Sequence, residues 1–158
     1  MPDMQAGWEQ MCSSVMTGLS GLNMVYEAAG MHASLLGFCH ESLILGDDLI
    51  GQSMRCVRGI EVSDETMALD QIASVCMGGP GHYLGTDQTL GRMQTDHVYP
   101  RLGDRTSPKE WAEIGKPNLV EKATKLKQEI LSKPSPVALD PMLDMALREK
   151  YNIHLKSV

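Results

Sequence analysis

Apolar residues recur at helical spacing along most of the 158-residue chain. Between Asp3 and Leu19 they fall on one side of a helix, at Trp8, Val15 and Leu19 among other positions, which predicts a helix there. The same periodicity returns several times, and the chain is therefore predicted to be rich in helices. The predicted helices cover about residues 3–19, 41–58, 63–76, 86–99, 107–115, 119–132 and 140–150.

Capping residues sharpen several of these boundaries. Ser63 precedes Asp64 and Glu65, whose negative charges suit the positive end of a helix dipole. The tail has the clearest signals. Ser107 with Pro108 and Glu110 is predicted to form a capping box, and Asn118 with Glu121 begins the following helix in the same way. The remaining predicted caps are Thr86 and Asp140. These local rules predict where the helices begin.

Two short apolar runs break the helical pattern. Leu22–Ala29 lies between two glycines and is typical of a strand buried on both faces, and Ser34–Cys39 is a second candidate. Gly30–His32 is predicted to be the loop between them. Helices alternating with buried strands indicate βα units of a parallel sheet, hence an α/β fold.

The two parts of the chain, before and after about residue 103, differ in lysine content and in charge. All eight lysines lie at or after Lys109, and the first hundred residues contain three arginines against twelve acidic residues. Because lysine is nearly always in contact with water, a long stretch without it suggests a segment packed against the tail, another subunit or a missing part of the fold. A bias of codon usage or lineage is the alternative explanation.

Overall composition excludes several classes of protein. The net charge of −6 argues against a nucleic-acid binder, and no apolar run approaches the roughly 20 residues of a membrane helix. The four cysteines are spread without a CxxC pair and are predicted to be reduced, buried thiols of a cytoplasmic protein. No His or Cys spacing supports a metal, so no metal site is predicted.

Candidate binding residues follow the predicted strands. Tyr26 and Glu27 would stand at the carboxyl end of the first strand, where parallel-sheet folds bind ligands, and a carboxylate beside an aromatic ring suits a cation. His32 lies on the next loop, and His82 and Tyr83 follow a Gly-Gly-Pro-Gly turn. Alternatively, Tyr26 is a core residue, Glu27 is solvated at the end of the strand, and the Gly-Gly-Pro-Gly segment is only a tight turn. No catalytic residue is identified.

Several motifs, each weak alone, occur in an order that resembles the C-terminal portion of the trimethylamine methyltransferase family. They span nearly the whole chain. The motifs are Pro2-Asp3-Met4-Gln5-Ala6-Gly7-Trp8-Glu9, Gly46-Asp47-Asp48-Leu49-Ile50-Gly51, Arg58-Gly59-Ile60-Glu61-Val62, Gly81-His82-Tyr83-Leu84-Gly85, Tyr99-Pro100-Arg101-Leu102-Gly103-Asp104-Arg105, Glu110-Trp111 and Gly115.

The resemblance implies a fold and a reaction. The fold is the C-terminal part of a (β/α)8 TIM barrel, its last βα units at residues 1–103, followed by a helical C-terminal extension at residues 104–158. The reaction moves a methyl group from a tertiary or quaternary methylamine, of the trimethylamine or glycine betaine type, to the Co(I) corrinoid (cobalamin) of a partner protein. This chain would itself bind no cofactor, and some family members use pyrrolysine.

The resemblance also implies an incomplete site, because a barrel takes about 250 residues. The expected partners are a corrinoid protein, a small methylated amine, and either the N-terminal barrel portion or further copies of the chain; neither nucleic acid nor membrane is expected. The isolated chain is predicted to be inactive. The alternative is a non-catalytic helical module for interaction or oligomerisation.

Overall fold

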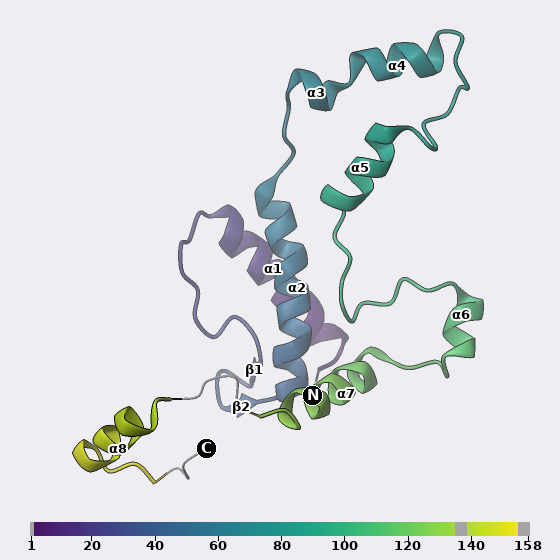
Figure 1. Cartoon of the computed structure of the whole chain (residues 1–158). Coiled ribbons are helices and arrows are strands. Elements are labelled where there is room, and N and C mark those ends of the chain that lie inside the picture. Colours follow the sequence, from purple (N-terminus) through teal and green to yellow (C-terminus); the bar gives the residue numbers. More distant parts are fainter. Residues whose placement is uncertain (1, 135–138, 155–158) are drawn as a thin grey trace.

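The computed structural model describes residues 2–134 and 139–154 as an open assembly of helices with one short β-hairpin (Figure 1). Helix is present in every segment where periodicity predicts it, although residues 63–76 form two helices and the helix predicted at residues 86–99 ends at Thr95. The elements are α1 (Met4–Leu19), β1 (Met31–His32), β2 (Gly37–Phe38), α2 (His40–Arg58), α3 (Asp64–Met67), α4 (Leu69–Cys76), α5 (Asp87–Thr95), α6 (Pro108–Glu113), α7 (Leu119–Leu131) and α8 (Pro141–Lys150).

The predicted caps are confirmed. Ser107 and Asn118 form complete capping boxes with Glu110 and Glu121. Ser63, Thr86 and Asp140 also accept main-chain hydrogen bonds at their helix starts. A further cap, not predicted, is Asp3, whose carboxylate accepts a hydrogen bond from the Ala6 N–H at 2.9 Å at the start of α1. Such signals act over three or four residues, so they operate whatever the rest of the chain does.

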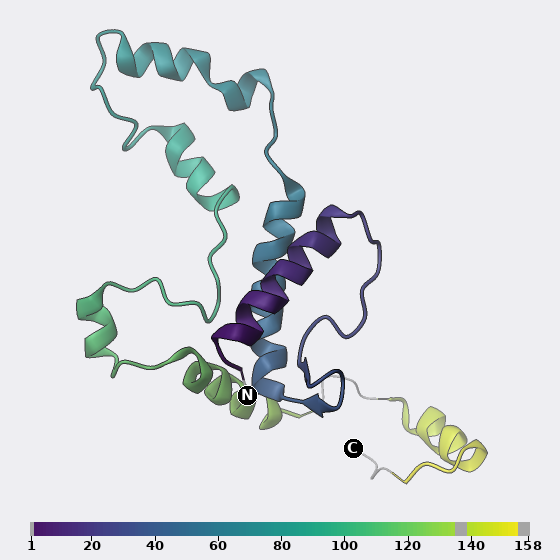
Figure 2. The same ribbon diagram turned by 180° about the vertical axis from the view of Figure 1, so that it is seen from behind.

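Helices α1 and α2 form the centre of the structure and run side by side in the same direction, with the segment of residues 20–39 returning between their ends (Figure 2). Small residues let the helices approach. The face of α2 that is buried carries Ser42, Gly46 and Ser53. A Cβ built at Gly18 of α1 would lie 2.4 Å from the side chain of Val57, so glycine is required for that approach.

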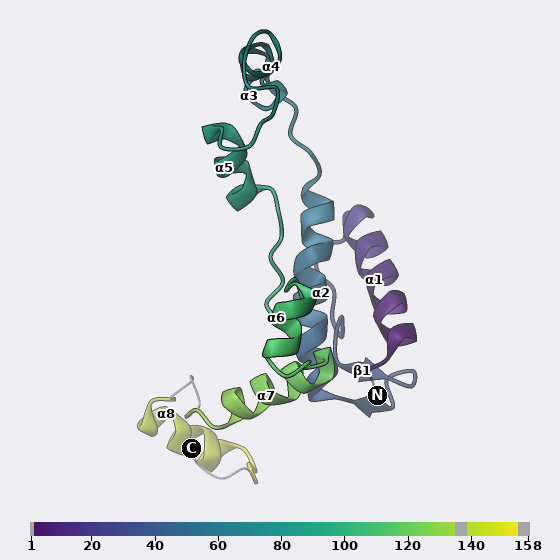
Figure 3. The same ribbon diagram turned by 90° about the vertical axis from the view of Figure 1, so that its right-hand side faces the viewer.

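Helix α7 crosses the N-terminal half of α2, and this contact attaches the tail to the central pair (Figure 3). Glu41 near the start of α2 pairs with Lys127 of α7. Further along α2, the Asp48 carboxylate accepts hydrogen bonds from three consecutive main-chain N–H groups, those of Arg101, Leu102 and Gly103, at 2.7, 3.2 and 3.2 Å. The tail is thus held by polar contacts at two points of one helix.

The predicted parallel strands are wrong. Leu22–Ala29 forms no strand, and the expected loop contributes Met31 and His32 to a two-residue strand that pairs antiparallel with Gly37 and Phe38. A strand buried on both faces needs neighbours to hydrogen-bond and pack with it, and the described residues supply none for Leu22–Ala29. Residues 2–134 and 139–154 are therefore rich in helices, as predicted, with one short antiparallel hairpin in place of the expected parallel strands.

Two further expectations need correction. The helix predicted from Ser63 to Cys76 is broken at Ala68, which has the left-handed φ of 52° and separates α3 from α4. On its predicted inner face only Val75 is buried, whereas Met67 and Ile72 are exposed. The cysteines are free thiols, but three are exposed and only Cys39 is half-buried.

Little apolar surface is removed from water. Among residues 2–134 and 139–154, the buried hydrophobic side chains are Val75, Leu102 and Ala123, whereas Met24 and Ile60 are 87% and 88% exposed. Trp8 on α1 is also exposed. The tail therefore covers only the part of the lysine-free half where α7 packs on α2. Across the same residues, no helix combines the length and the apolarity needed to cross a bilayer.

Candidate functional site

Two of the predicted binding residues, Glu27 and His32, line one cavity of about 380 Å³ beside α1. We call it the acid-lined cavity, because Glu9 of α1 faces it as well. Its polar lining also includes Gln10, Ser13, Ser34 and Ser42. Three segments far apart in the sequence therefore meet here: α1, the segment before and after β1, and the first turn of α2.

Hydrogen bonds fix the polar side chains of this cavity. Gln10 Nε2 donates to the Ala28 carbonyl at 2.8 Å, which ties the segment before β1 to α1. Gln5 Nε2 donates to Glu9 Oε1 at 2.9 Å. His32 Nε2 and Ser42 Oγ lie 2.6 Å apart, and the Ser42 side chain is buried, so this bond holds the imidazole against α2.

The backbone around the cavity adopts an uncommon conformation. Glu27 has φ 55°, and the consecutive residues Ala33, Ser34 and Leu35 have φ 50°, 52° and 69°. Non-glycine residues rarely occupy the left-handed region, at a cost on the order of 1 kcal/mol or more each, and such residues concentrate at ligand-binding and catalytic sites. The strain therefore supports assigning a function to this cavity.

The electrostatics of the acid-lined cavity suit a cation. Glu9 and Glu27 bring two carboxylates to it, and apart from His32 no basic side chain occurs among the described lining residues. Opposite charges attract strongly where protein displaces part of the solvent. Both carboxylates are exposed, and they place negative charge beside the Gln10 amide and the His32 imidazole, an arrangement that suits a cation better than an anion.

The other predicted residues lie elsewhere. Tyr26 is 81% exposed and precedes Glu27 without facing the cavity. His82 and Tyr83 belong to the loop between α4 and α5, at the far end of the structure from β1 (Figure 1). Tyr83 Oη lies 3.5 Å from Cys76 Sγ, and this hydrogen bond raises the pKa of the tyrosine. The structure thus joins Glu27 with His32 and separates them from His82 and Tyr83.

Sequence reasoning missed Gln10 and Ser42 as members of the site. A signal for Ser42 was present: Ser42, Gly46 and Ser53 recur along one face of α2, and small residues at helical spacing mark the face where another segment approaches. Gln10 had no comparable signal, because its role depends on where the Ala28 carbonyl is placed.

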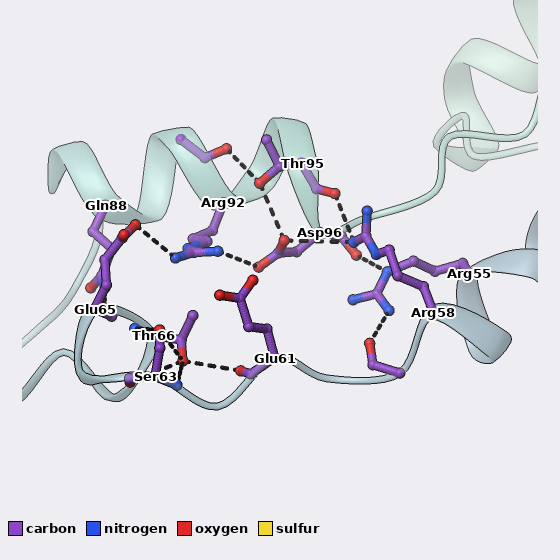
Figure 4. A network of polar contacts seen from close by, with 12 residues as sticks. Arg55, Arg58, Glu61, Ser63, Glu65, Thr66, Gln88, Arg92, Thr95 and Asp96 are labelled. Atoms are coloured by element: carbon purple, nitrogen blue, oxygen red, sulfur yellow. Dashed lines mark hydrogen bonds and ion pairs between the residues drawn. The ribbon is translucent and has the colours of Figure 1, made fainter.

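A second polar cluster joins α2 to the arm, by which we mean residues 63–95 with α3, α4 and α5 (Figure 4). It gathers all three arginines of the first hundred residues around Asp96. Arg58 and Arg92 pair with the Asp96 carboxylate at 3.6 and 3.7 Å, and Arg55 donates to its carbonyl at 2.8 Å. Arg92 also pairs with Glu65 at 3.1 Å. Each of these arginines thus has an acidic or carbonyl partner within the protein. The contacts of Arg55 and Arg58 hold the end of the arm against α2.

Glu41 is paired with Lys127 of α7. Its carboxylate accepts hydrogen bonds from Lys127 Nζ and from Thr124 Oγ1, the latter at 3.2 Å. In the described part of the chain, no three His, Cys, Asp or Glu side chains are grouped closely enough to hold a metal ion. The Lys127 hydrogen bond lowers the pKa of Glu41 from 4.5 to about 2.

We expect this pair to make folding depend on pH. A carboxyl whose pKa is lower in the folded than in the unfolded state stabilises the fold above its unfolded pKa, and the stabilisation disappears as pH falls from about 4.5 to about 2. Glu41→Gln should remove that part of the acid dependence in urea titrations followed by circular dichroism. Glu113→Gln is the control, because the Lys109–Glu113 pair is exposed at 3.9 Å. Equal acid profiles for wild type and Glu41→Gln would contradict the assignment.

Comparison with known proteins identifies the family. The profile of the family described as trimethylamine methyltransferase (MTTB) matches residues 1–156. The chain belongs to this family. The resemblance predicted from the sequence motifs is therefore confirmed, and the chain is a member of a methyltransferase family.

Named relatives agree with this assignment. The chain is 31% identical over 146 residues to the glycine betaine methyltransferase of Desulfitobacterium hafniense strain Y51, a match covering 92% of this chain and 30% of that protein. It is 34% identical over 148 residues to the trimethylamine methyltransferase MttB2 of Methanosarcina mazei, covering 92% and 29%. The chain thus spans about three tenths of the length of these trimethylamine methyltransferase family members.

Proposed function

We propose that this chain is the C-terminal portion of a methyltransferase that moves a methyl group from a tertiary or quaternary methylamine to the Co(I) corrinoid of a partner protein. The observation that supports this most is the family match over residues 1–156. The relatives are named for trimethylamine or glycine betaine, which share a methylated nitrogen that is positively charged in protonated trimethylamine and in the quaternary ammonium group of glycine betaine. A catalytic role is favoured over a purely structural module because these relatives are named as methyltransferases.

In this proposal the acid-lined cavity contributes to holding the amine. A methylated ammonium ion cannot donate many hydrogen bonds, so it is recognised by charge and by contact with apolar or aromatic groups. Glu9 and Glu27 supply the negative charge, and Gln10 and His32 supply polar contacts beside it. Tyr26, His82 and Tyr83 remain predicted substrate-binding residues that become relevant only if further protein surrounds them.

The reaction needs little acid–base chemistry from this chain. Cobalt supplies the electron pair of the new cobalt–carbon bond, the carbon–nitrogen bond breaks, and its electron pair stays on the nitrogen of the departing amine. The corrinoid is carried by the partner protein and acts as the methyl acceptor. The task of the chain is then to orient the ammonium ion so that one methyl group faces the acceptor.

The rest of the fold supplies the remaining walls of the site. We propose that residues 1–103 complete a (β/α)8 barrel and that residues 104–158 form its helical extension, docked through α7. The large exposed apolar surface of the first hundred residues supports this, since isolated soluble proteins seldom leave so much of it uncovered. The isolated 158-residue chain is accordingly proposed to be inactive.

A chimera tests the proposed function. Residues 2–156 replace the matching segment of the Desulfitobacterium hafniense glycine betaine methyltransferase, and methyl transfer from glycine betaine to free cob(I)alamin is followed by the loss of Co(I) absorbance. We expect turnover by the chimera and none by the isolated chain, because only the chimera encloses the amine. A folded chimera without turnover, or an isolated chain as active as the chimera, would refute the proposal.

A further inference from the structure

The first turn of α2 lies between α7 and the hairpin of β1 and β2 (Figure 3). Glu41 of this turn pairs with Lys127 of α7, and both side chains are largely withdrawn from solvent, with exposed fractions of 17% and 27%. The next residue, Ser42, is buried, and its Oγ lies 2.6 Å from His32 Nε2. Two adjacent residues of one helical turn therefore connect the tail to the imidazole of the acid-lined cavity.

This turn lacks the local signal that fixes other helix starts. Asp3 and Asn118 accept main-chain hydrogen bonds at the starts of α1 and α7, whereas in the described residues Cys39, the N-cap of α2, makes no such side-chain bond. A first turn without a cap frays readily, because its N–H groups have no partners within the helix. The position of residues 40–43 therefore depends on contacts with other segments.

The hairpin that carries His32 depends on the same turn. Its strands have two residues each, and an isolated hairpin is at best marginally stable in water. The Cys39 N–H donates to the Gly30 carbonyl at 2.9 Å, and a Cβ built at Gly30 would lie 3.1 Å from the Leu43 Cβ. The chain on either side of the hairpin is thus held against the start of α2, and the hairpin must follow that turn when it moves.

Helix α7 also reaches the other side of the pair formed by His32 and Ser42. A second cavity, of about 580 Å³, is lined by residues of α1, α2 and α7. Leu119 and Val120 are the residues that α7 contributes to it. Gln10, His32 and Ser42 line this cavity and the acid-lined cavity alike. A shift of α7 therefore changes the wall that the two cavities share.

From these contacts we infer that α7 positions the His32 imidazole at the acid-lined cavity through the first turn of α2. Glu41 and Lys127 are then positioning residues, which act through Ser42 and do not contact the amine. Loss of their pair leaves the turn free to fray, and the imidazole then loses the serine hydroxyl that holds it. The role in catalysis rests on the proposed function, whereas the position of the imidazole is a property of this chain alone.

Nuclear magnetic resonance of the 158-residue chain tests the positioning. In Lys127→Met, the ring-proton signals of His32, assigned with His32→Gln, should move toward their positions in Ser42→Ala, which lacks the hydroxyl. The amides of residues 40–43 should exchange on the order of tenfold faster, because the partly buried pair no longer holds the turn. Lys127→Arg keeps a cation beside Glu41 and should restore both measurements to their wild-type values.

A second lysine of α7 provides the matched control. Lys125 is on the same helix and is exposed, so Lys125→Met should leave both measurements at their wild-type values. Thr124→Val removes the 3.2 Å hydrogen bond to Glu41 and should move the His32 signals in the same direction as Lys127→Met. Signals that stay in place in both variants overturn the inference. An equal effect of Lys125→Met also overturns it, since the net charge of the tail would then be the cause.

The chimera with the Desulfitobacterium hafniense protein tests the role in methyl transfer. With Lys127→Met, the KM for glycine betaine should rise about threefold or more while kcat changes less than about twofold, because a displaced imidazole weakens binding of the ground state and the transition state alike. Lys127→Arg should restore the KM, and Lys125→Met should not change it. An active chimera whose KM is unchanged by Lys127→Met overturns the positioning role. If the chimera is inactive, the proposed function fails, while the spectra of the 158-residue chain still decide the position of His32.

Discussion

Asp48→Ala will detach the tail from the central helices. The Asp48 carboxylate is the shared acceptor for the main-chain N–H groups of Arg101, Leu102 and Gly103, and an alanine leaves all three without it. Hydrogen bonds to a charged group contribute about 1.5–3 kcal/mol, so we expect the docking of residues 99–131 to weaken by about 2–3 kcal/mol. Faster hydrogen exchange at residues 101–103 and throughout α7 would measure the effect.

The neighbouring acid provides a matched control. Asp47 is on the same helix, carries the same charge and is exposed. Asp47→Ala should leave both the exchange of residues 101–103 and that of α7 as in the wild type. If Asp47→Ala and Asp48→Ala had the same effect, the cause would be the loss of negative charge on α2 and not the three hydrogen bonds.

Gly46→Ala will separate α2 from the segment before β1. A Cβ at residue 46 would lie 2.4 Å from the Ala29 Cβ and 2.6 Å from Gln10 Nε2, far closer than atoms can approach. Overpacking of this kind costs about 1–3 kcal/mol. We expect a lower urea midpoint of helix unfolding by circular dichroism and faster exchange at residues 28–30, because the Gln10 bond to the Ala28 carbonyl must move.

A second glycine of α2 is the control for that substitution. Around Gly51 no atom lies within 4 Å of an added Cβ. Gly51→Ala should therefore stabilise the helix, by up to about 1 kcal/mol, through helix propensity alone. Opposite signs at the two positions are the expected result; stabilisation by Gly46→Ala would show that α1 and the segment before β1 are not held against α2.

The helices could be predicted from the sequence because their signals are local. A cap such as Asn118 with Glu121 needs only four consecutive residues, and the structure contains that capping box. The break at Ala68 was missed for the opposite reason. Ala68 has a high helix propensity, so nothing in the local sequence predicts its left-handed backbone.

The strands could not be placed from residue spacing, because spacing does not show which segments pair with one another. The apolar run Leu22–Ala29 predicts burial, but a strand exists only through its neighbours. The residues of the candidate site also divide into those that the local sequence predicts and those that depend on packing. Glu27 and His32 were found by their closeness to that run, and the structure joins them in one cavity. Gln10 and Ser42 depend on the packing of α1 against α2, which residue spacing alone describes poorly.

The joint between α2 and the arm has a physical consequence of its own. Its attachments are contacts of the Arg55 and Arg58 guanidinium groups of α2 with the Asp96 side chain and with the main-chain carbonyls of Thr95 and Asp96 (Figure 4). Dissolved ions weaken attractions between exposed charges over a screening length of about 8–10 Å at ordinary concentrations. We therefore expect added salt to loosen the arm at this joint, whereas the close approach of α1 to α2 at Gly18, which depends on the absence of a side chain, has no such dependence.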